Sequence, residues 1–155
     1  MIRPITPLTA LVIAMAIGAA PHPVSAQRAT PAEAKALLEK AVAHYKDVGR
    51  AKALADFTGK KAPFADRDLY VFCIGSNRVI SAHGATASYV GSSADALKDA
   101  DGKPLGKAIL DAAAKGGESV RYRWVNPVSG KIEPKVSFVE KVGEDVCGVG
   151  AYEGQ

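Results

Sequence analysis

The sequence predicts an α+β domain built around one antiparallel sheet, because an amphipathic helix is followed by several short apolar strands. Residues 31–48 place apolar side chains at three- and four-residue spacing, which makes one apolar stripe. Residues 69–74 form a nearly continuous apolar run between turn residues, as central strands do. The expected order is a long helix, a short helix, two strands, a helical crossover and three strands.

Local signals mark where the first helix begins and ends. Thr30 offers a hydroxyl cap, Pro31 suits the first helical position, and Glu33 completes a capping box. Gly49 ends the apolar stripe, and a second short helix is expected over residues 51–57. The stripe of the first helix needs a flat apolar surface to pack on, which the sheet would supply.

The middle of the chain connects two halves of the sheet. Residues 78–83 follow a Gly-Ser-Asn turn and are the expected hairpin partner of residues 69–74. Residues 84–117 differ in character, with an acidic turn and a helix expected near residues 105–114. This segment is predicted to be a long crossover.

Two alternating strands form a second predicted hairpin. Residues 120–125 and 135–140 alternate, and residues 126–134 between them form a longer loop. With Trp124 placed opposite Lys135, one face of the hairpin is mixed in character, because strand side chains alternate. On that face lie Val120, Tyr122, Trp124, Lys135, Ser137 and Val139.

This face has the make-up of a small polar-anion site, since it combines two aromatic side chains that have polar tips with a lysine and a hydroxyl. An ammonium buried without compensation is costly, so an inward Lys135 needs an acid or a ligand anion. Two alternatives remain open. Lys135 would snorkel to water from a strand end, and Tyr122 and Trp124 would be plain core residues.

Three further positions are ambiguous in the sequence. His83 ends the second strand, where an imidazole donates to a carboxylate or caps the strand. Tyr70 lies on one face of the first strand and Cys73 on the other, and both orientations stay open. In the last strand, residues 146–152, two glycines indicate that another backbone or a ligand comes close.

The amino-terminal residues have the layout of a secretory signal peptide. Arg3 precedes an apolar run over residues 8–20, which is shorter than the roughly 20 residues that cross a bilayer. Small residues lead up to a cut after Ala26. We expect a signal peptide over residues 1–26 and one domain over residues 27–155, periplasmic or secreted, with no membrane span after cleavage. An uncleaved anchor is the alternative.

The two cysteines, Cys73 and Cys147, tend to pair in an oxidising compartment. Two buried thiols are the alternative. No metal or other cofactor is predicted, because His44 and His83 lie far apart and no Cys-x-x-Cys spacing occurs.

Several function classes are excluded by what the sequence lacks. The formal net charge of +4 includes no run of basic residues, so nucleic acid is not an expected partner. No Gly-x-Ser-x-Gly, phosphate-binding loop or His-Glu-x-x-His motif occurs, and no enzymatic chemistry is predicted.

Seven short segments, taken in order, resemble a single Cache domain. They are residues 68–72, 82–83, 90–91, 99–103, 122–124, 135–139 and 148–152. The resemblance implies a PAS-like five-stranded antiparallel sheet, with a long N-terminal helix on one face and a helical crossover over a ligand pocket on the other. It also implies ligands such as acetate, propionate, pyruvate or lactate. In that strand order the first and last strands are neighbours, which brings Cys73 and Cys147 close together.

The chain departs from the family pattern at Gly84, where relatives tend to have proline, and at Phe138, where they tend to have tyrosine. Gly84 is expected to loosen its turn, and Phe138 lacks one hydroxyl of the pocket or core. Most relatives also lie between membrane helices and feed a kinase or chemotaxis module.

These observations together predict a periplasmic domain that binds or senses a small organic acid. The candidate ligand-binding residues are Lys135, Tyr122, Trp124, His83, Ser137 and Tyr70. The expected partners are the ligand and a membrane receptor, kinase or transporter. The alternative is a structural or protein-interaction module of the cell envelope that has the same fold and a filled pocket.

Overall fold

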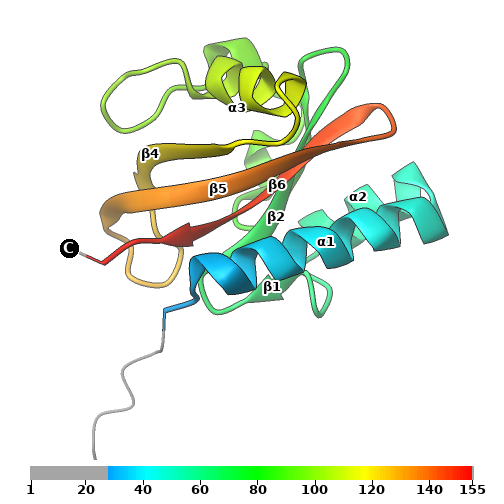
Figure 1. The fold of residues 1–155 in the computed structure, drawn as a ribbon, viewed down its shortest axis with the longest axis horizontal. Coiled ribbons are helices and arrows are strands. Elements are labelled where there is room, and N and C mark those ends of the chain that lie inside the picture. Colours follow the sequence, from blue (N-terminus) through cyan, green and yellow to red (C-terminus); the bar gives the residue numbers. More distant parts are fainter. Residues whose placement is uncertain (1–27, 155) are drawn as a thin grey trace, which may run out of the picture.

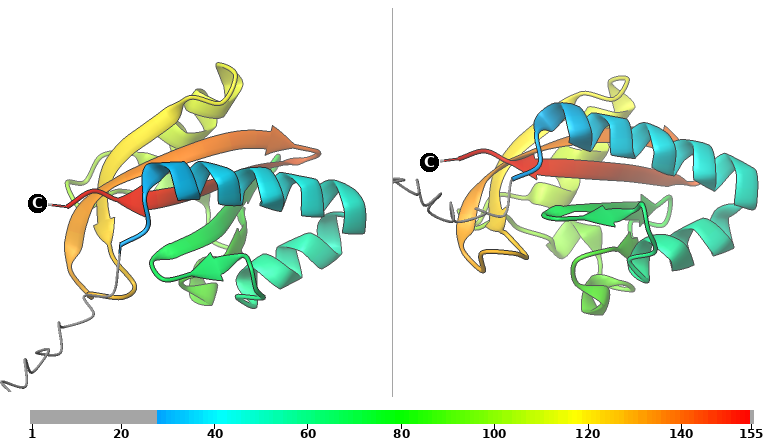
Figure 2. Two further views of the ribbon diagram at one scale, coloured as in Figure 1. Left: turned by 60° about the horizontal axis from the view of Figure 1, so that its bottom comes forward. Right: turned by 90° about the horizontal axis from the view of Figure 1, so that it is seen from below.

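The chain folds into an antiparallel sheet that carries helices on both faces (Figure 1). The computed structural model describes residues 28–154, and the expected signal peptide and its cleavage site lie outside them. Helix α1 (Pro31–Val48) packs along β5 and β6, and Figure 2 shows it running beside β6. Helix α3 (Leu105–Ala114) packs on the opposite face, against β4 and β5. The predicted fold class is confirmed.

The sheet has six strands in the order β1-β2-β6-β5-β4, with β3 also paired to β2. The strands are β1 (Ala65–Asp66), β2 (Leu69–Gly75), β3 (Ile80–His83), β4 (Ser119–Val125), β5 (Ile132–Val142) and β6 (Asp145–Tyr152). The expectation of five strands was one short, because a turn at Arg67, whose φ is 55°, folds β1 back onto β2. The two-residue β1 looks like part of that turn in the sequence.

Helix α1 begins as predicted. The Thr30 side chain accepts a hydrogen bond from the Glu33 backbone N–H, and Glu33 accepts one from the Thr30 backbone N–H. Gly49 has a φ of 81°, and its positive value separates α1 from α2 (Arg50–Thr58). The crossover between β3 and β4 contains two short 3-10 helices, η1 (Ala87–Tyr89) and η2 (Ala94–Ala96), before α3.

The β4–β5 hairpin has a different register from the one expected. Lys135 pairs with Tyr122 and not with Trp124, which pairs with Glu133. The loop is shorter than expected because Asn126 closes it, donating its backbone N–H to the carbonyl of Lys131 at 2.8 Å. Since the register differs by an even number of residues, each side chain keeps the face that was predicted for it.

The disulfide between Cys73 and Cys147 is present. The two cysteines are paired directly across β2 and β6, with their Cα atoms 4.0 Å apart. Both lie on the α1 side of the sheet, in the apolar core that also contains Val71 and Val149. The neighbouring pairing of the first long strand and the last strand, implied by the family resemblance, is therefore confirmed.

Replacing both Cys73 and Cys147 with alanine is expected to lower the free energy of unfolding by about 4 kcal/mol. The disulfide closes a loop with a sequence separation of 74, and its loss frees the unfolded chain. Equilibrium unfolding in urea measures the change. A reductant should lower the stability of the parent protein and leave the double variant unaffected. Equal stability of the two oxidised proteins would contradict the expectation.

Candidate ligand pocket

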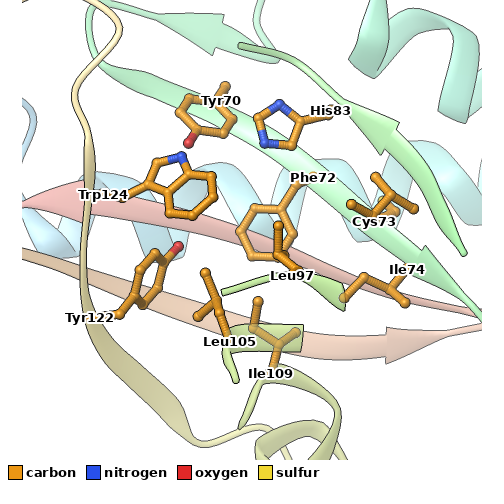
Figure 3. Close-up of a pocket in the computed structure, with 11 residues that line it drawn as sticks. Tyr70, Phe72, Cys73, Ile74, His83, Leu97, Leu105, Ile109, Tyr122 and Trp124 are labelled. Atoms are coloured by element: carbon orange, nitrogen blue, oxygen red, sulfur yellow. The ribbon is translucent and has the colours of Figure 1, made fainter. Parts of the chain in front are cut away.

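A small cavity lies between the sheet and the crossover, on the face opposite α1 (Figure 3). Its volume is about 20 Å³, which is room for about one water molecule. The lining residues are Tyr70, Phe72, Cys73, Ile74, Ile80, His83, Leu97, Leu105, Ile109, Tyr122 and Trp124. In this closed form the cavity is smaller than any organic acid.

The cavity has a polar aromatic end and an apolar end. Figure 3 shows Tyr70, His83 and Trp124 grouped at one end, with the Trp124 indole nitrogen near the Tyr70 hydroxyl. Leu105 and Ile109 of the crossover side lie at the other end. A ligand with a charged or polar head and a short apolar tail matches this division.

Lys135 lies at the polar aromatic end and does not snorkel to water. Its side chain is 1% exposed, and its Nζ lies 3.9 Å from the ring centroid of Tyr70 and 4.7 Å from that of Tyr152. Within residues 28–154, Nζ is the one buried side-chain nitrogen or oxygen that has no hydrogen-bond partner. Burial lowers the pKa of Lys135 to about 7, although the charge of Asp68 acts in the opposite direction.

The Lys135 side chain extends from β5 across the face of β6 and passes directly over Gly150. A Cβ atom on Gly150 would lie 2.1 Å from Ser137 Oγ and 2.5 Å from Lys135 Cε. A Cβ on Gly148 would lie 2.4 Å from Cζ of Phe72. The sequence-based expectation of a close backbone is met by β5, whose carbonyl oxygens at Phe138 and Val136 would lie 3.0 Å from these two Cβ atoms, and side chains of the pocket face come closer still.

Tyr122 and Ser137 form a hydrogen-bonded pair on the same face. The Tyr122 hydroxyl and Ser137 Oγ are 2.8 Å apart. Burial raises the pKa of Tyr122 well above its usual range, so the phenol stays neutral. Its proton is available either to Ser137 or to an acceptor in the cavity.

His83 is neutral and holds the turn that follows β3. Its Nδ1 accepts a hydrogen bond from the backbone N–H of Thr86 at 3.0 Å, so the neutral ring carries its proton on Nε2. Burial, together with the charge of Lys135, lowers the pKa of His83 to about 4. The ring packs 5.1 Å from the rings of Tyr70 and Tyr89. Of the two roles predicted for His83, donation to a carboxylate and capping of the strand, the structure shows the capping contact with Thr86.

The two departures from the family pattern do not disturb the pocket. Gly84 donates its backbone N–H to the carbonyl of Val71 at 2.8 Å, and a Cβ there would lie 3.1 Å from the Cβ of Tyr70. The turn is therefore tight, and the expectation that Gly84 loosens it is wrong. Phe138 packs against the core under α1, so the missing hydroxyl lies outside the pocket.

Asp68, the carboxylate whose charge raises the pKa of Lys135, forms its hydrogen bonds with other groups. Asp68 is 2% exposed, accepts the backbone N–H of Ala29 at 3.0 Å, and receives a long contact from Asn126 at 3.5 Å. Glu133 is bound by Arg28, Asn126 and Ser129. In the described part of the chain no carboxylate forms an ion pair with Lys135.

Four of the six predicted site residues line the cavity: Tyr70, His83, Tyr122 and Trp124. Lys135 and Ser137 do not line it but contact lining residues, Lys135 against Tyr70 and Ser137 against Tyr122. Two aromatic rings that were not predicted lie next to this group. Tyr70 lines the cavity and Val71 does not; Cys73 borders the cavity as well, although its side chain belongs to the core under α1. Tyr152 lies over Lys135, and it shares a strand face with Gly148 and Gly150, a pattern that the sequence contains. Tyr89 comes from the irregular crossover, where no periodicity predicts its position.

A long helix on one face of an antiparallel sheet and an aromatic pocket under a crossover on the other define a PAS-like sensor domain. The chain belongs to the single Cache domain 2 family, whose model matches residues 10–153. Domains of this family are extracytoplasmic modules that bind small ligands. The resemblance seen in the sequence is confirmed.

Three solved structures are similar to this chain. A methyl-accepting chemotaxis protein from Vibrio parahaemolyticus RIMD 2210633 is 23% identical, with a TM-score of 0.67 over 78% of this chain and 86% of that chain. The periplasmic sensor domain of a chemotaxis protein is 25% identical, with a TM-score of 0.62 over 79% and 90%. A Cache chemosensory domain, described for its carboxylic acid recognition, is 19% identical, with a TM-score of 0.59 over 79% and 88%.

A comparison with curated proteins found no match. Among residues 28–154, no helix has the length and apolar character needed to span a membrane. In the same range, no three His, Cys, Asp or Glu side chains are grouped so as to hold a metal ion.

Changing Gly150 to alanine is expected to destabilise the protein by about 1–3 kcal/mol, because the new methyl group displaces Lys135 and Ser137 from the sheet surface. Equilibrium unfolding measures the loss. Gly154→Ala is the matched control, since no atom lies within 4 Å of a Cβ at that position. A Gly150→Ala protein as stable as its parent would show that Lys135 is not held across this glycine.

Proposed function

We propose that this protein is a periplasmic domain that binds or senses a small organic acid, with Lys135 as the residue that holds the carboxylate. The observation that carries the proposal is the buried Nζ of Lys135, which has no hydrogen-bond partner and lies against the ring of Tyr70, a residue that lines the cavity. A buried ammonium without a counter-charge is unfavourable, and a ligand carboxylate would supply that charge.

Neutral donors around Lys135 support a carboxylate rather than a cation as the ligand. Tyr122 offers a hydroxyl, Trp124 an indole N–H, and His83 the N–H on Nε2. The apolar end, at Leu105 and Ile109, suits a short alkyl group. Acetate, propionate, pyruvate and lactate each combine a carboxylate with a short alkyl group. The structural neighbour described for carboxylic acid recognition supports the same ligand class.

Binding requires the pocket to enlarge, because about 20 Å³ holds no more than a water molecule. The crossover supplies Leu97, Leu105 and Ile109 to the cavity wall, so an outward shift of this segment is the natural route. We infer that the ligand enters under the crossover. We also infer that a shift of the crossover on ligand binding is the signal that a membrane receptor, kinase or transporter recognises.

The small cavity also favours a second candidate function. A protein-interaction module of the envelope would keep its pocket filled by its own side chains, as this closed form does. For both candidate functions we propose a domain that is not an enzyme and that is exported to the periplasm after cleavage behind Ala26, a proposal supported by the layout of residues 1–26.

A thermal-shift screen with small acids separates the two functions. A ligand should raise the unfolding free energy by RT ln(1 + [L]/Kd), whereas a filled module should show no shift. Lys135→Met should weaken binding by about 1.5–3 kcal/mol, the range for a hydrogen bond to a charged group. The unliganded variant should be at least as stable as its parent, because a buried amine without a partner is removed. Lys141→Met, an exposed position on the same strand, is the control.

The affinity for a carboxylate should fall as the pH rises above about 7. The free protein loses the Lys135 proton through this range, while the bound anion favours the ammonium, so binding must take up a proton. The expected loss is about tenfold for each pH unit above about 7. Calorimetry of propionate binding in two buffers that differ in ionisation enthalpy measures the proton uptake. A pH-independent affinity, equal in the parent and in Lys135→Met, would rule out Lys135 as the anion-binding group.

A further inference from the structure

We propose that the Lys135 amine captures ligands that carry a carbonyl group, α-keto acids above all, as a reversible imine. This inference rests on the proposed function, because it uses the same pocket, and it narrows the ligand class from carboxylates to carbonyl acids. The geometry that points to it is a buried amine with no hydrogen-bond partner, which lies against an aromatic residue of the cavity wall and close to two hydroxyl groups.

The Lys135 amine meets the requirements of a nucleophile. Attack on a carbonyl needs a neutral amine with a free lone pair, and desolvation in an apolar pocket is a known way to obtain one. Nζ is buried, accepts and donates no hydrogen bond, and lies between the rings of Tyr70 and Tyr152. Asp68, whose carboxylate would otherwise hold the amine as an ammonium, is bound to the backbone of Ala29.

The ring of Tyr70 is in contact with both the Lys135 amine and the cavity. Tyr70 lines the cavity, and its ring is 3.9 Å from Nζ. A carbonyl carbon needs to come within about 3–3.5 Å of the amine to react. Imine formation therefore requires the Tyr70 ring to move aside, in addition to the enlargement that any organic acid requires of this pocket.

Hydroxyl groups are placed to move the protons that imine formation requires. Ser137 Oγ and Lys135 Cε both lie within 2.5 Å of one point above Gly150, so the hydroxyl is close to the end of the lysine side chain. Ser137 is in turn paired with the Tyr122 hydroxyl at 2.8 Å. The pair forms a short chain that both accepts and donates protons.

The reaction balances without any other reagent. The nitrogen lone pair attacks the carbonyl carbon, the C=O π electrons move to oxygen, and a proton passes from nitrogen to that oxygen to give a carbinolamine. A second proton, taken from solvent water and passed on by the Tyr122–Ser137 hydroxyl pair, then reaches the oxygen. The C–O bond breaks and water leaves as the C=N bond forms, so the product is the protonated imine. Hydrolysis by one water reverses the step, so the ligand can be released unchanged.

An α-keto acid suits this site better than a simple ketone. A protonated imine keeps a positive charge on the nitrogen, and the ligand's own carboxylate lies beside it, so the buried charge is compensated within the adduct. The donors on Trp124 and His83 remain available to the carboxylate oxygens. Acetate and propionate, which have no ketone or aldehyde group, bind without forming a covalent bond.

Reductive trapping with pyruvate and sodium cyanoborohydride tests the inference on the folded protein. The expected product is a secondary amine at Lys135, one equivalent per chain, with a mass gain equal to the ligand minus one oxygen atom. Peptide mapping locates the adduct. Lys135→Arg should abolish it and Lys141→Met should retain it, while excess propionate should slow trapping several-fold. The yield should rise between about pH 6 and pH 8, opposite to the trend for carboxylate binding, because the neutral amine reacts.

The outcomes separate this inference from the proposed function. Thermal shifts with both propionate and pyruvate, but no adduct at Lys135, would overturn the imine and leave carboxylate binding in place. Adducts confined to exposed lysines such as Lys141 would overturn it in the same way. No shift with any acid and no adduct at Lys135 would overturn both proposals.

Discussion

The rest of the pocket depends on keeping one amine out of water with no polar partner. Such burial is unfavourable, and the structure maintains it by surrounding Lys135 with rings and giving its side chain a path across Gly150. Tyr70 and Tyr152 cover Nζ, and their electron-rich faces favour its charge, as does the carboxylate of Asp68 at longer range. The lowered pKa of Lys135 follows from this burial, and the pKa of His83 is lowered first by its own burial and then by the charge of Lys135.

Another buried charged residue, Asp145 at the start of β6, has the hydrogen-bond partners that Lys135 lacks. Asp145 is 1% exposed and accepts hydrogen bonds from Tyr45, Arg50 and Ser81. Although burial alone raises the pKa of Asp145, the bonds from Arg50, Ser81 and Tyr45 bring it below its usual value. Asp145 thereby ties α1, α2 and β3 to the start of β6. The contrast with Lys135 is the reason to assign the unsatisfied group to binding and the satisfied one to stability.

Local chemistry explains which features the sequence could predict. The Thr30 cap and the three- and four-residue spacing specify α1, and strand alternation places Tyr122, Lys135 and Ser137 on one face even though the register was misjudged. The length of the loop after Asn126 could not be predicted, since it depends on hydrogen bonds that close the turn. The cavity volume and the ring over Lys135 depend on packing between distant segments, which periodicity does not describe.

The single tryptophan of the chain has a consequence for how this pocket is studied. Trp124 lies in the cavity wall, 6.2 Å from the ring of Tyr122 and 6.0 Å from that of Tyr89. Indole emission depends on the polarity and contacts of its surroundings, and here all of it originates beside the cavity. The unlabelled protein therefore contains its own optical reporter, with nearby tyrosines as energy donors, and opening of the crossover can be followed by fluorescence in real time.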